Sequence, residues 1–284
     1  MIPSSETSSA SEDICSDSAV SSPPAISANC VPPPQQPVIA GPEGIFFDFN
    51  LGARLSLPVR ETGKWKFVIK DLDTGNILFT NETAGAFVRS SKRFYVRFGL
   101  EVHDIREDGT TAGIFRHELD LRNRKVIIQF PVGTLGDTLA WFPYAERFAL
   151  RHGAEVTCVL SGAILPLFRD SYPDLKLISQ EDAKEQDIYT NCYASYCLGL
   201  FFDDEEHIWQ PTDFRFTGLH RTARYILGVD PSEVPRVSPF RMIRALWRSL
   251  IPTLGCPDSY LISLAACRVG HFADHRAEAD LSYA

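Results

Sequence analysis

The stretch VIIQFPVGTLGDTLAWFPYAERFALRHGAEV, residues 126–156, decides the fold. It opens with VIIQF, a short continuous apolar run of the kind found in buried parallel strands. A loop with two glycines follows, and a helix-length segment begins near Asp137 and runs toward Arg151. The pattern predicts a strand, a loop and a helix in that order, and we expect an α/β domain to start here.

Further segments downstream continue the alternation of strands and helices. EVTCVL and DLKLIS predict strands, ILPLFRDSY predicts a helix between them, and YASYCLGL fits either a strand or a helix. FTGLHRTARYILGV predicts one amphipathic helix over 216–229, because its apolar residues recur on one face at helical spacing. Such alternation favours a doubly wound parallel sheet. We therefore expect a Rossmann-like domain over 124–238.

The region before this domain has a different sequence pattern, with short apolar, aromatic and β-branched runs that are broken by turn residues. In WKFVIKDLDTGNILF, the group Asp-Thr-Gly-Asn at 73–76 predicts a turn between two antiparallel strands, since Gly and Asn accept positive φ at small steric cost. We expect a small β-barrel or sandwich over 44–122.

The two ends of the chain fit neither pattern. Residues 1–42 are rich in Ser, Pro and Ala and have few large apolar groups, which predicts a disordered tail. Residues 239–284 are partly apolar but show no clear order of strand, loop and helix. We expect an atypical tail there.

Composition limits the classes of function. The 284 residues suffice for about two domains. A net charge of −8 argues against a nucleic-acid or anionic membrane surface, because such surfaces are bound through clustered Lys and Arg. The seven cysteines contain no CxxC pair, so they predict neither a disulfide framework nor a zinc ribbon. With no signal-peptide pattern and no apolar run of about 18 residues, we expect a cytoplasmic protein without a membrane span.

The loop at 131–137 is the best candidate for chemistry. In an open α/β sheet, ligands bind outside the carboxyl ends of the strands, where this loop lies. Gly133 and Gly136 let a ligand approach the backbone, but their spacing matches neither the dinucleotide fingerprint nor a P-loop. Asp137 could act as a general base toward an attacking hydroxyl, or it could simply cap the helix. Spacing alone leaves both readings open.

Several long blocks resemble a known family. IQFPVGTLGDTLAWFPY, YCLGLFFDDEEHIWQPTDFRFTGLHRTARYILGVDP, DLDTGNILF and SSKRFYVRFGLEV are similar to blocks of the bacterial autotransporter O-heptosyltransferases. The resemblance covers about 44–237 and implies an enzyme with a GT-B-type glycosyltransferase fold of two Rossmann domains, whose N-terminal half is present here. It implies inverting, metal-independent transfer of heptose from ADP-heptose to Ser or Thr of an autotransporter passenger protein.

The same resemblance assigns roles to residues of the loop. The aspartate of the family's Gly-Asp motif falls on Asp137 and implies that Asp137 is the general base. We expect Gly133, Thr134, Gly136 and Trp141 to contribute to substrate binding, although the cluster Trp141, Phe142 and Tyr144 also suits helix packing. No metal ligand is expected in this chain.

The chain departs from the family after about residue 238. The family's second domain carries a lysine for the diphosphate and a four-cysteine iron site, and we find neither among the last 45 residues. The C-terminal half therefore looks largely missing, as in a truncated or frame-shifted product. We expect little or no transfer by this chain, no cofactor held by it, and ADP-heptose contacts in the missing half.

Two alternatives of function remain, a lipopolysaccharide heptosyltransferase and a non-catalytic module that binds an autotransporter. A β region ahead of the Rossmann part favours a protein acceptor over a lipid. A homo-oligomer is compatible with the family.

The sequence supports weaker predictions for several other polar residues and for two cysteines. The acidic run at 203–206 beside His207 predicts a solvated turn rather than a metal site. The segment at 207–211 is a candidate wall of the acceptor cleft, on the family resemblance. His220 predicts a structural histidine rather than an anion ligand, and Cys192 and Cys197 predict buried thiols.

Overall fold

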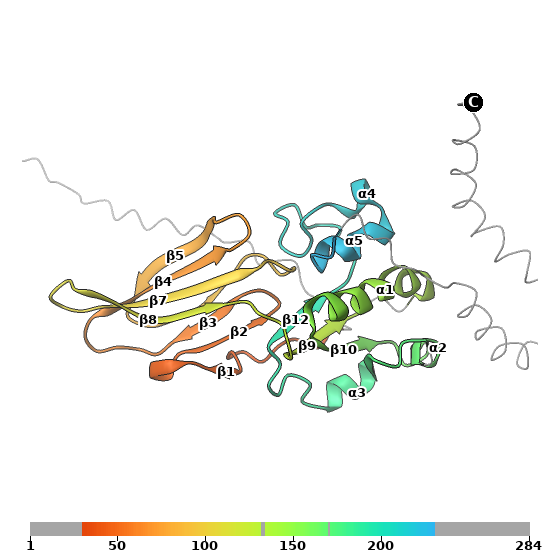
Figure 1. Ribbon diagram of the computed structural model, residues 1–284, viewed down its shortest axis with the longest axis horizontal. Coiled ribbons are helices and arrows are strands. Elements are labelled where there is room, and N and C mark those ends of the chain that lie inside the picture. The colour runs from red at the N-terminus through yellow and green to blue at the C-terminus, as the bar shows by residue number, and fades with distance from the viewer. Residues whose placement is uncertain (1–29, 132–133, 170, 231–284) are drawn as a thin grey trace, which may run out of the picture.

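The computed structural model describes residues 30–131, 134–169 and 171–230. Two β-sheets and five α-helices make up this part of the chain (Figure 1). Most of the predicted N-terminal tail and all of the predicted C-terminal tail lie outside the described residues. The frame-shift hypothesis concerns the C-terminal tail and therefore also lies outside them. None of the described helices is both long enough and apolar enough to cross a bilayer.

A four-stranded antiparallel sheet forms one end of the molecule. Its order is β5 (Ile77–Thr83), β4 (Lys64–Asp71), β7 (Phe98–Ile105) and β8 (Thr111–Glu118). The side chains of β4 alternate, so Trp65, Phe67 and Ile69 are buried on one face. This face packs against the second sheet, and the aromatic rings of Phe47 and Phe115 lie 5.0 Å apart across the interface.

The turn between β4 and β5 is the predicted one. Asp71 accepts hydrogen bonds from the amides of Asp73 and Gly75 through its side chain and carbonyl, respectively. Gly75 has φ of 76°, in the left-handed region that glycine adopts without a steric penalty. The predicted hairpin over these strands is confirmed.

We expect Gly75→Ala to lower the free energy of unfolding by about 1–2 kcal/mol, the cost of a left-handed conformation for a residue with a Cβ. A Cβ at this position would meet no atom within 4 Å, so the cost is backbone strain alone. Gly75→Asn is the matched control, since asparagine tolerates this conformation better, and urea unfolding measures both. Equal loss in the two variants would contradict the prediction.

The second sheet has eight strands and mixes two styles of pairing. Its parallel portion is β11 (Lys176–Ser179), β10 (Glu155–Leu160), β9 (Lys125–Gln129) and β12 (Ala194–Cys197). β12 then pairs in parallel with β2 (Phe46–Asn50), which continues antiparallel into β3 (Arg54–Leu57) and β6 (Ala86–Arg89). β1 (Ile39–Ala40) pairs with β2, and a 3-10 turn (Pro42–Gly44) separates the two.

One sheet therefore runs across the predicted boundary at 122–124. The division into a β domain and a Rossmann-like domain stays a prediction, and the structure adds a shared sheet to it. Residues 30–40, which we expected in the tail, contact this sheet. The amide and carbonyl of Val31 bond to the Gln129 side chain at 2.8 and 2.9 Å, and Cys30 is buried.

Helices cover both faces of the parallel portion. Ile128 and Cys158 face the core that contains α1 (Leu135–His152) and α2 (Leu165–Arg169). Ile127 and Val159 point the other way, against Ala183 of α3 (Gln180–Glu185). This arrangement is the doubly wound type, and the predicted α/β class, with its strand, loop and helix at 126–156, is confirmed. YASYCLGL contains a strand.

The amphipathic segment near 216–229 differs from the single helix we predicted. It forms α4 (Phe214–Thr217) and α5 (Leu219–Ile226), separated by Gly218. Gly218 has φ of 76° and ψ of 153°, a conformation that ends one helix before the next begins. The apolar face is nevertheless as expected, because Ala223 and Ile226 are buried against α1.

Candidate active site

The site lies where the order in which the chain adds parallel strands to the sheet reverses. From β9 the chain moves outward to β10 and β11, and then returns to place β12 on the other side of β9. The ends of β9 and β12 are adjacent, since the Leu198 amide donates to the Gln129 carbonyl at 2.9 Å. Open α/β sheets bind ligands at such a reversal, outside the carboxyl ends of the strands. The loops that follow β9 and β12 therefore share the binding edge.

Asp137 lies in the first turn of α1, three residues after the residue that caps the helix. Thr134 is the N-cap, although its side chain makes no capping hydrogen bond. The Thr134 hydroxyl donates instead to Oδ2 of Asp137. The interpretation of Asp137 as the helix cap is therefore wrong, because the extended backbone that a cap requires occurs at Thr134. Asp137 is partly exposed, and its Oδ1 has no hydrogen-bond partner among the described residues.

The neighbours expected to bind substrate have different settings. Gly133 lies outside the described residues. Thr134 and Gly136 are exposed at the helix start, and a Cβ on Gly136 would meet no atom within 4 Å. A ligand can thus approach the backbone beside Asp137 without obstruction. Their roles in binding stay a prediction.

Trp141 lies deeper than a residue that contacts substrate. Trp141 is 1% exposed, and its indole donates to the Leu219 carbonyl at 2.8 Å. Phe142 and Tyr144 are 0% exposed. The ring therefore has no face open for stacking on a sugar, and the structure favours the helix-packing interpretation for all three aromatic residues. Trp141 positions α5 against α1.

We expect Trp141→Phe to lower the free energy of unfolding by about 1–3 kcal/mol, because the Leu219 carbonyl loses its indole donor and a smaller ring replaces a fully buried one. Leu150→Ala is the control on the same helix, since Leu150 is 69% exposed and its removal should cost less than about 0.5 kcal/mol. Urea unfolding of both variants measures the difference. A stability of Trp141→Phe equal to that of Leu150→Ala would contradict the prediction.

The loop after β12 is organised by one buried carboxylate. Asp204 accepts the backbone amides of Ile208, Trp209 and Gln210 at 2.7, 2.9 and 3.0 Å. The expected solvated turn is thus only partly correct, because Asp203, Glu205 and Glu206 are exposed while Asp204 points inward. These hydrogen bonds shape the segment 207–211.

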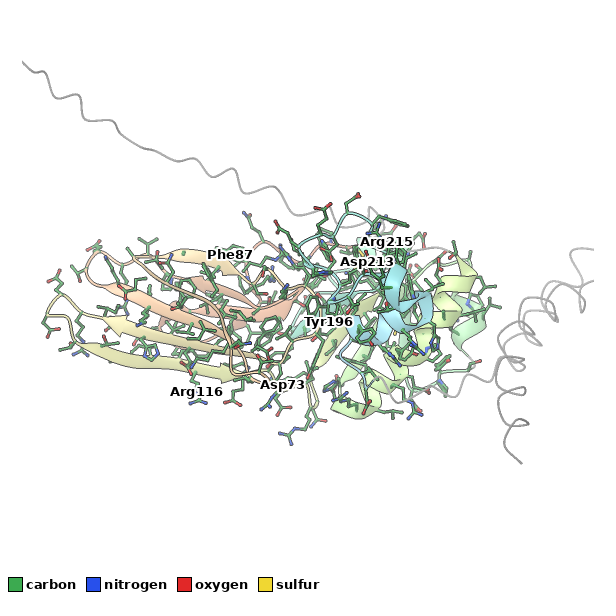
Figure 2. All side chains as sticks on the ribbon, turned by 90° about the horizontal axis from the view of Figure 1, so that it is seen from above. Asp73, Phe87, Arg116, Tyr196, Asp213 and Arg215 are labelled. Atoms are coloured by element: carbon green, nitrogen blue, oxygen red, sulfur yellow. The ribbon has the colours of Figure 1, made fainter. Side chains whose placement is uncertain are left out.

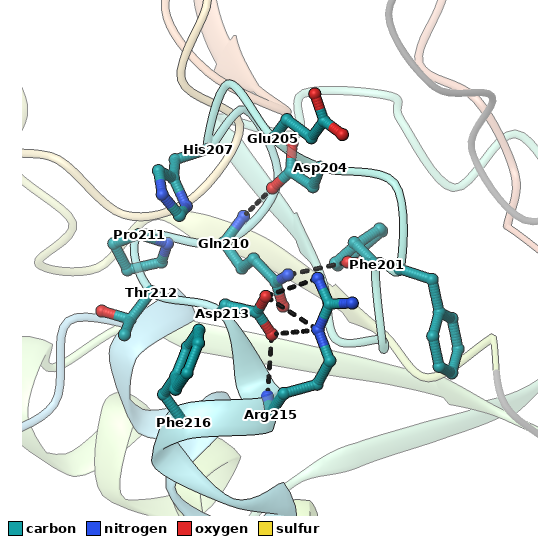
Figure 3. Close-up of a pocket in the computed structure, with 11 residues that line it drawn as sticks. Phe201, Asp204, Glu205, His207, Gln210, Pro211, Thr212, Asp213, Arg215 and Phe216 are labelled. Carbon is teal, nitrogen blue, oxygen red and sulfur yellow. Dashed lines mark hydrogen bonds and ion pairs between the residues drawn. The ribbon is translucent and has the colours of Figure 1, made fainter.

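This loop and α4 enclose a cavity of about 430 Å³ (Figure 3). Its lining includes Phe202, Gln210, Asp213, Arg215 and Phe216. Asp213 accepts the Arg215 backbone amide and two hydrogen bonds from its guanidinium, which lowers the pKa of the Asp213 carboxyl. Figure 2 shows this pair over the α/β end of the molecule, far from Phe87 and Arg116.

Sequence reasoning missed two of these lining residues, Asp213 and Arg215, and it named Gln210 only as part of the segment 207–211. Asp213 carried one usable signal, because an aspartate ahead of a helical segment favours a capping role, and Asp213 caps α4. Nothing in the spacing of Gln210 distinguishes it from a surface glutamine. Its position depends on the buried Asp204.

Metal binding finds no support in this part of the chain. Among residues 30–131, 134–169 and 171–230, no three His, Cys, Asp or Glu side chains converge. The described residues therefore do not fit an iron site. Cys192 and Cys197 are buried thiols, and the Sγ atoms of Cys197 and Cys30 lie 2.8 Å apart.

His220 has a structural setting. The Tyr144 hydroxyl lies 3.1 Å from its ring, and burial, with Arg224 and Arg221 nearby, lowers the pKa of His220. The ring is therefore neutral near pH 7. A neutral imidazole suits packing between α1 and α5 better than binding an anion.

Comparisons with known proteins bear on this site. The family model for the N-terminal domain of the glycosyltransferase TibC matches residues 41–106. The autotransporter heptosyltransferase TibC of Escherichia coli O78:H11 is 42% identical over 205 residues, 72% of this chain and 48% of the relative. The inactive autotransporter heptosyltransferase BimC of Burkholderia thailandensis is 37% identical over 205 residues, 72% of this chain and 45% of the relative.

The fold agrees with these similarities. A crystal structure of dodecameric, iron-containing heptosyltransferase TibC in complex with ADP-D-beta-D-heptose superposes with a TM-score of 0.64 at 43% identity. The match covers 72% of this chain and 51% of that one, and the predicted glycosyltransferase fold is confirmed. The chain spans about half the length of the curated relatives it matches. These similarities identify the chain as a homologue of the autotransporter heptosyltransferases.

Proposed function

We propose that this chain supplies the acceptor side of an autotransporter O-heptosyltransferase, with Asp137 as the general base. The reaction is transfer of heptose from ADP-heptose to a Ser or Thr hydroxyl of a passenger protein. The observation that carries the proposal is the Asp137 carboxylate, which lies at the switch point with Oδ1 free of protein partners among the described residues. The autotransporter enzymes among its relatives favour a protein acceptor over lipopolysaccharide.

The geometry suggests how proton and sugar would move. The Thr134 hydroxyl holds Oδ2 of Asp137, which fixes the carboxylate and leaves Oδ1 to accept the proton of the acceptor hydroxyl. The oxygen then attacks the anomeric carbon, the bond from that carbon to the diphosphate breaks, and ADP leaves from the opposite side. Configuration at the anomeric carbon is thereby inverted.

Other parts of the proposal concern contacts beyond the described residues. We place the donor nucleotide contacts and the iron site of the family there, as the family resemblance implies. The described residues contain no group of three His, Cys, Asp or Glu side chains that could hold a metal ion. Assembly into a homo-oligomer and a cytoplasmic location complete the proposal. A nucleotide-activated sugar as donor supports that location.

Coexpression with an unmodified autotransporter passenger tests the function. Because turnover by this chain is expected to be slow, products are collected overnight and the passenger is analysed by peptide mass spectrometry. In line with the little transfer expected of this chain, we expect heptosyl groups on Ser or Thr of only a small fraction of the passenger, and none in a host that lacks ADP-heptose. A passenger without heptose in both hosts would contradict catalysis by this chain.

A second candidate is a non-catalytic module that binds the passenger. BimC, which shares the matched region at 37% identity, is named an inactive heptosyltransferase, so catalysis and the fold can be separated in this group. Co-purification of passenger and chain without any transfer would favour this candidate.

A further inference from the structure

The cavity beside α4 contains a buried acceptor atom without a partner. Gln210 is 2% exposed, and its Nε2 donates to the Phe201 carbonyl at 2.8 Å, which fixes the orientation of the amide. Gln210 belongs to the cavity lining, and its buried Oε1 accepts no hydrogen bond from the residues that the structure describes. Buried polar atoms are rarely left unpaired in folded proteins. An atom held in this way is positioned to accept a hydrogen bond from a ligand.

The same cavity offers a donor. Arg215 uses Nε and Nη2 on Asp213, at 2.6 to 3.0 Å, and no hydrogen bond from its Nη1 is found among the described residues. Figure 3 shows Gln210 between Phe201 and the Asp213–Arg215 pair. One acceptor and one donor without a partner among the described residues thus belong to neighbouring residues of the cavity lining.

Aromatic side chains complete the lining. Phe202 is 61% exposed and Phe216 is 87% exposed, and the Phe202 ring rests edge-on against Phe214 with centroids 4.9 Å apart. Large exposed aromatic side chains at a cavity rim are typical of binding surfaces. Both rings can cover apolar parts of a ligand.

The charges at the cavity argue against the nucleotide donor. Asp204, Glu205 and Asp213 line it, whereas the guanidinium of Arg215 is already paired with Asp213. A diphosphate would meet an excess of negative charge. The carboxylates of Asp204 and Asp213 are also occupied by protein donors, so they are poorly placed to bind the many hydroxyls of a sugar.

We propose that this cavity binds the backbone of the polypeptide acceptor. A peptide group has one N–H and one C=O, which match Oε1 of Gln210 and Nη1 of Arg215. Phe202 and Phe216 pack on the flanking side chains of the peptide. The loop that carries the cavity follows β12 and Asp137 follows β9, so a bound strand can run along one sheet edge toward the base. This inference rests on the proposed function.

Binding of a dye-labelled, unmodified autotransporter passenger to the full chain, measured by fluorescence anisotropy, tests the inference. We expect Gln210→Leu and Phe216→Ala each to raise the Kd by about tenfold, as residues central to an interface do. Phe216 is nearly fully exposed, so its variant remains informative if Gln210→Leu fails to fold. The control is Phe87→Ala on β6, a phenylalanine 51% exposed and remote from the cavity, which should leave the Kd unchanged.

Three results would overturn the inference. They are a Kd unaffected by Phe216→Ala, displacement of the passenger by free heptose, and absence of passenger binding to the wild type. If heptosyl transfer occurs while Phe216→Ala binds normally, only this inference fails. If the passenger binds through Phe216 but receives no heptose, the inference stands and the proposed catalysis fails.

Discussion

Asp137→Asn is expected to lower heptosyl transfer by about 10²–10⁴-fold, the range over which a positioned general base accelerates a reaction. Asparagine has the size of aspartate and its carbonyl still accepts the Thr134 hydroxyl, so the start of α1 should keep its shape. What it loses is the ability to take the proton of the acceptor hydroxyl. The acceptor oxygen then remains a weak nucleophile.

The measurement is the fraction of passenger that carries heptose against time, by intact-protein mass spectrometry under single-turnover conditions. Glu146→Gln is the matched control, because Glu146 is a carboxylate in the middle of the same helix and away from the sheet edge. We expect its rate to equal that of the wild type. Transfer by Asp137→Asn at the wild-type rate would restrict Asp137 to a structural role at the helix start.

Asp48→Ala is expected to lower the free energy of unfolding by about 3–5 kcal/mol, because it leaves the buried guanidinium of Arg54 without its counter-ion. Asp48 is 0% exposed and Arg54 is 2% exposed, and their closest atoms lie 2.5 Å apart. Asp48 also accepts the amides of Val38 and Asn50 at 3.0 and 3.1 Å. One carboxylate thus joins the segment before β1 to β2 and β3.

Urea unfolding followed by tryptophan fluorescence measures this loss. Arg116→Ala is the control, since it removes an exposed ion pair with Glu118 and should cost less than about 1 kcal/mol. The double variant Asp48→Leu with Arg54→Met should recover part of the loss, because apolar side chains need no counter-charge. A stability of Asp48→Ala within 1 kcal/mol of the control would contradict the prediction.

Local sequence patterns were sufficient to predict the strand, loop and helix at 126–156 and the turn between β4 and β5. The apolar run at 126–130 and the glycines after it predict β9, the loop and α1, because burial on both faces of a strand requires such a run. The turn at Gly75 could likewise be predicted, from the group Asp-Thr-Gly-Asn at 73–76. Asp137 was singled out because it lies at the start of the helix after this loop, and its role as general base, which the family resemblance implies, stays a prediction.

The features that were missed depend on long-range contacts. No local sequence pattern predicts that β2 pairs with β12, because the pairing joins residues far apart in the sequence. The cavity beside α4 depends on a carboxylate, Asp204, whose inward position cannot be read from an acidic run. The break at Gly218 was masked by an apolar pattern that continues through it.

The strand shared between the two halves of the molecule also constrains how the chain folds. Phe49 of β2 pairs with Ala194 of β12, so the ribosome completes the edge of the parallel sheet long after β2 has emerged. Contacts between distant segments slow folding, because the chain must close a long loop before they form. Until β12 emerges, the part of β2 at Phe49 and Asn50 lacks its partner strand, and a chaperone that shields this edge would raise the yield of folded protein.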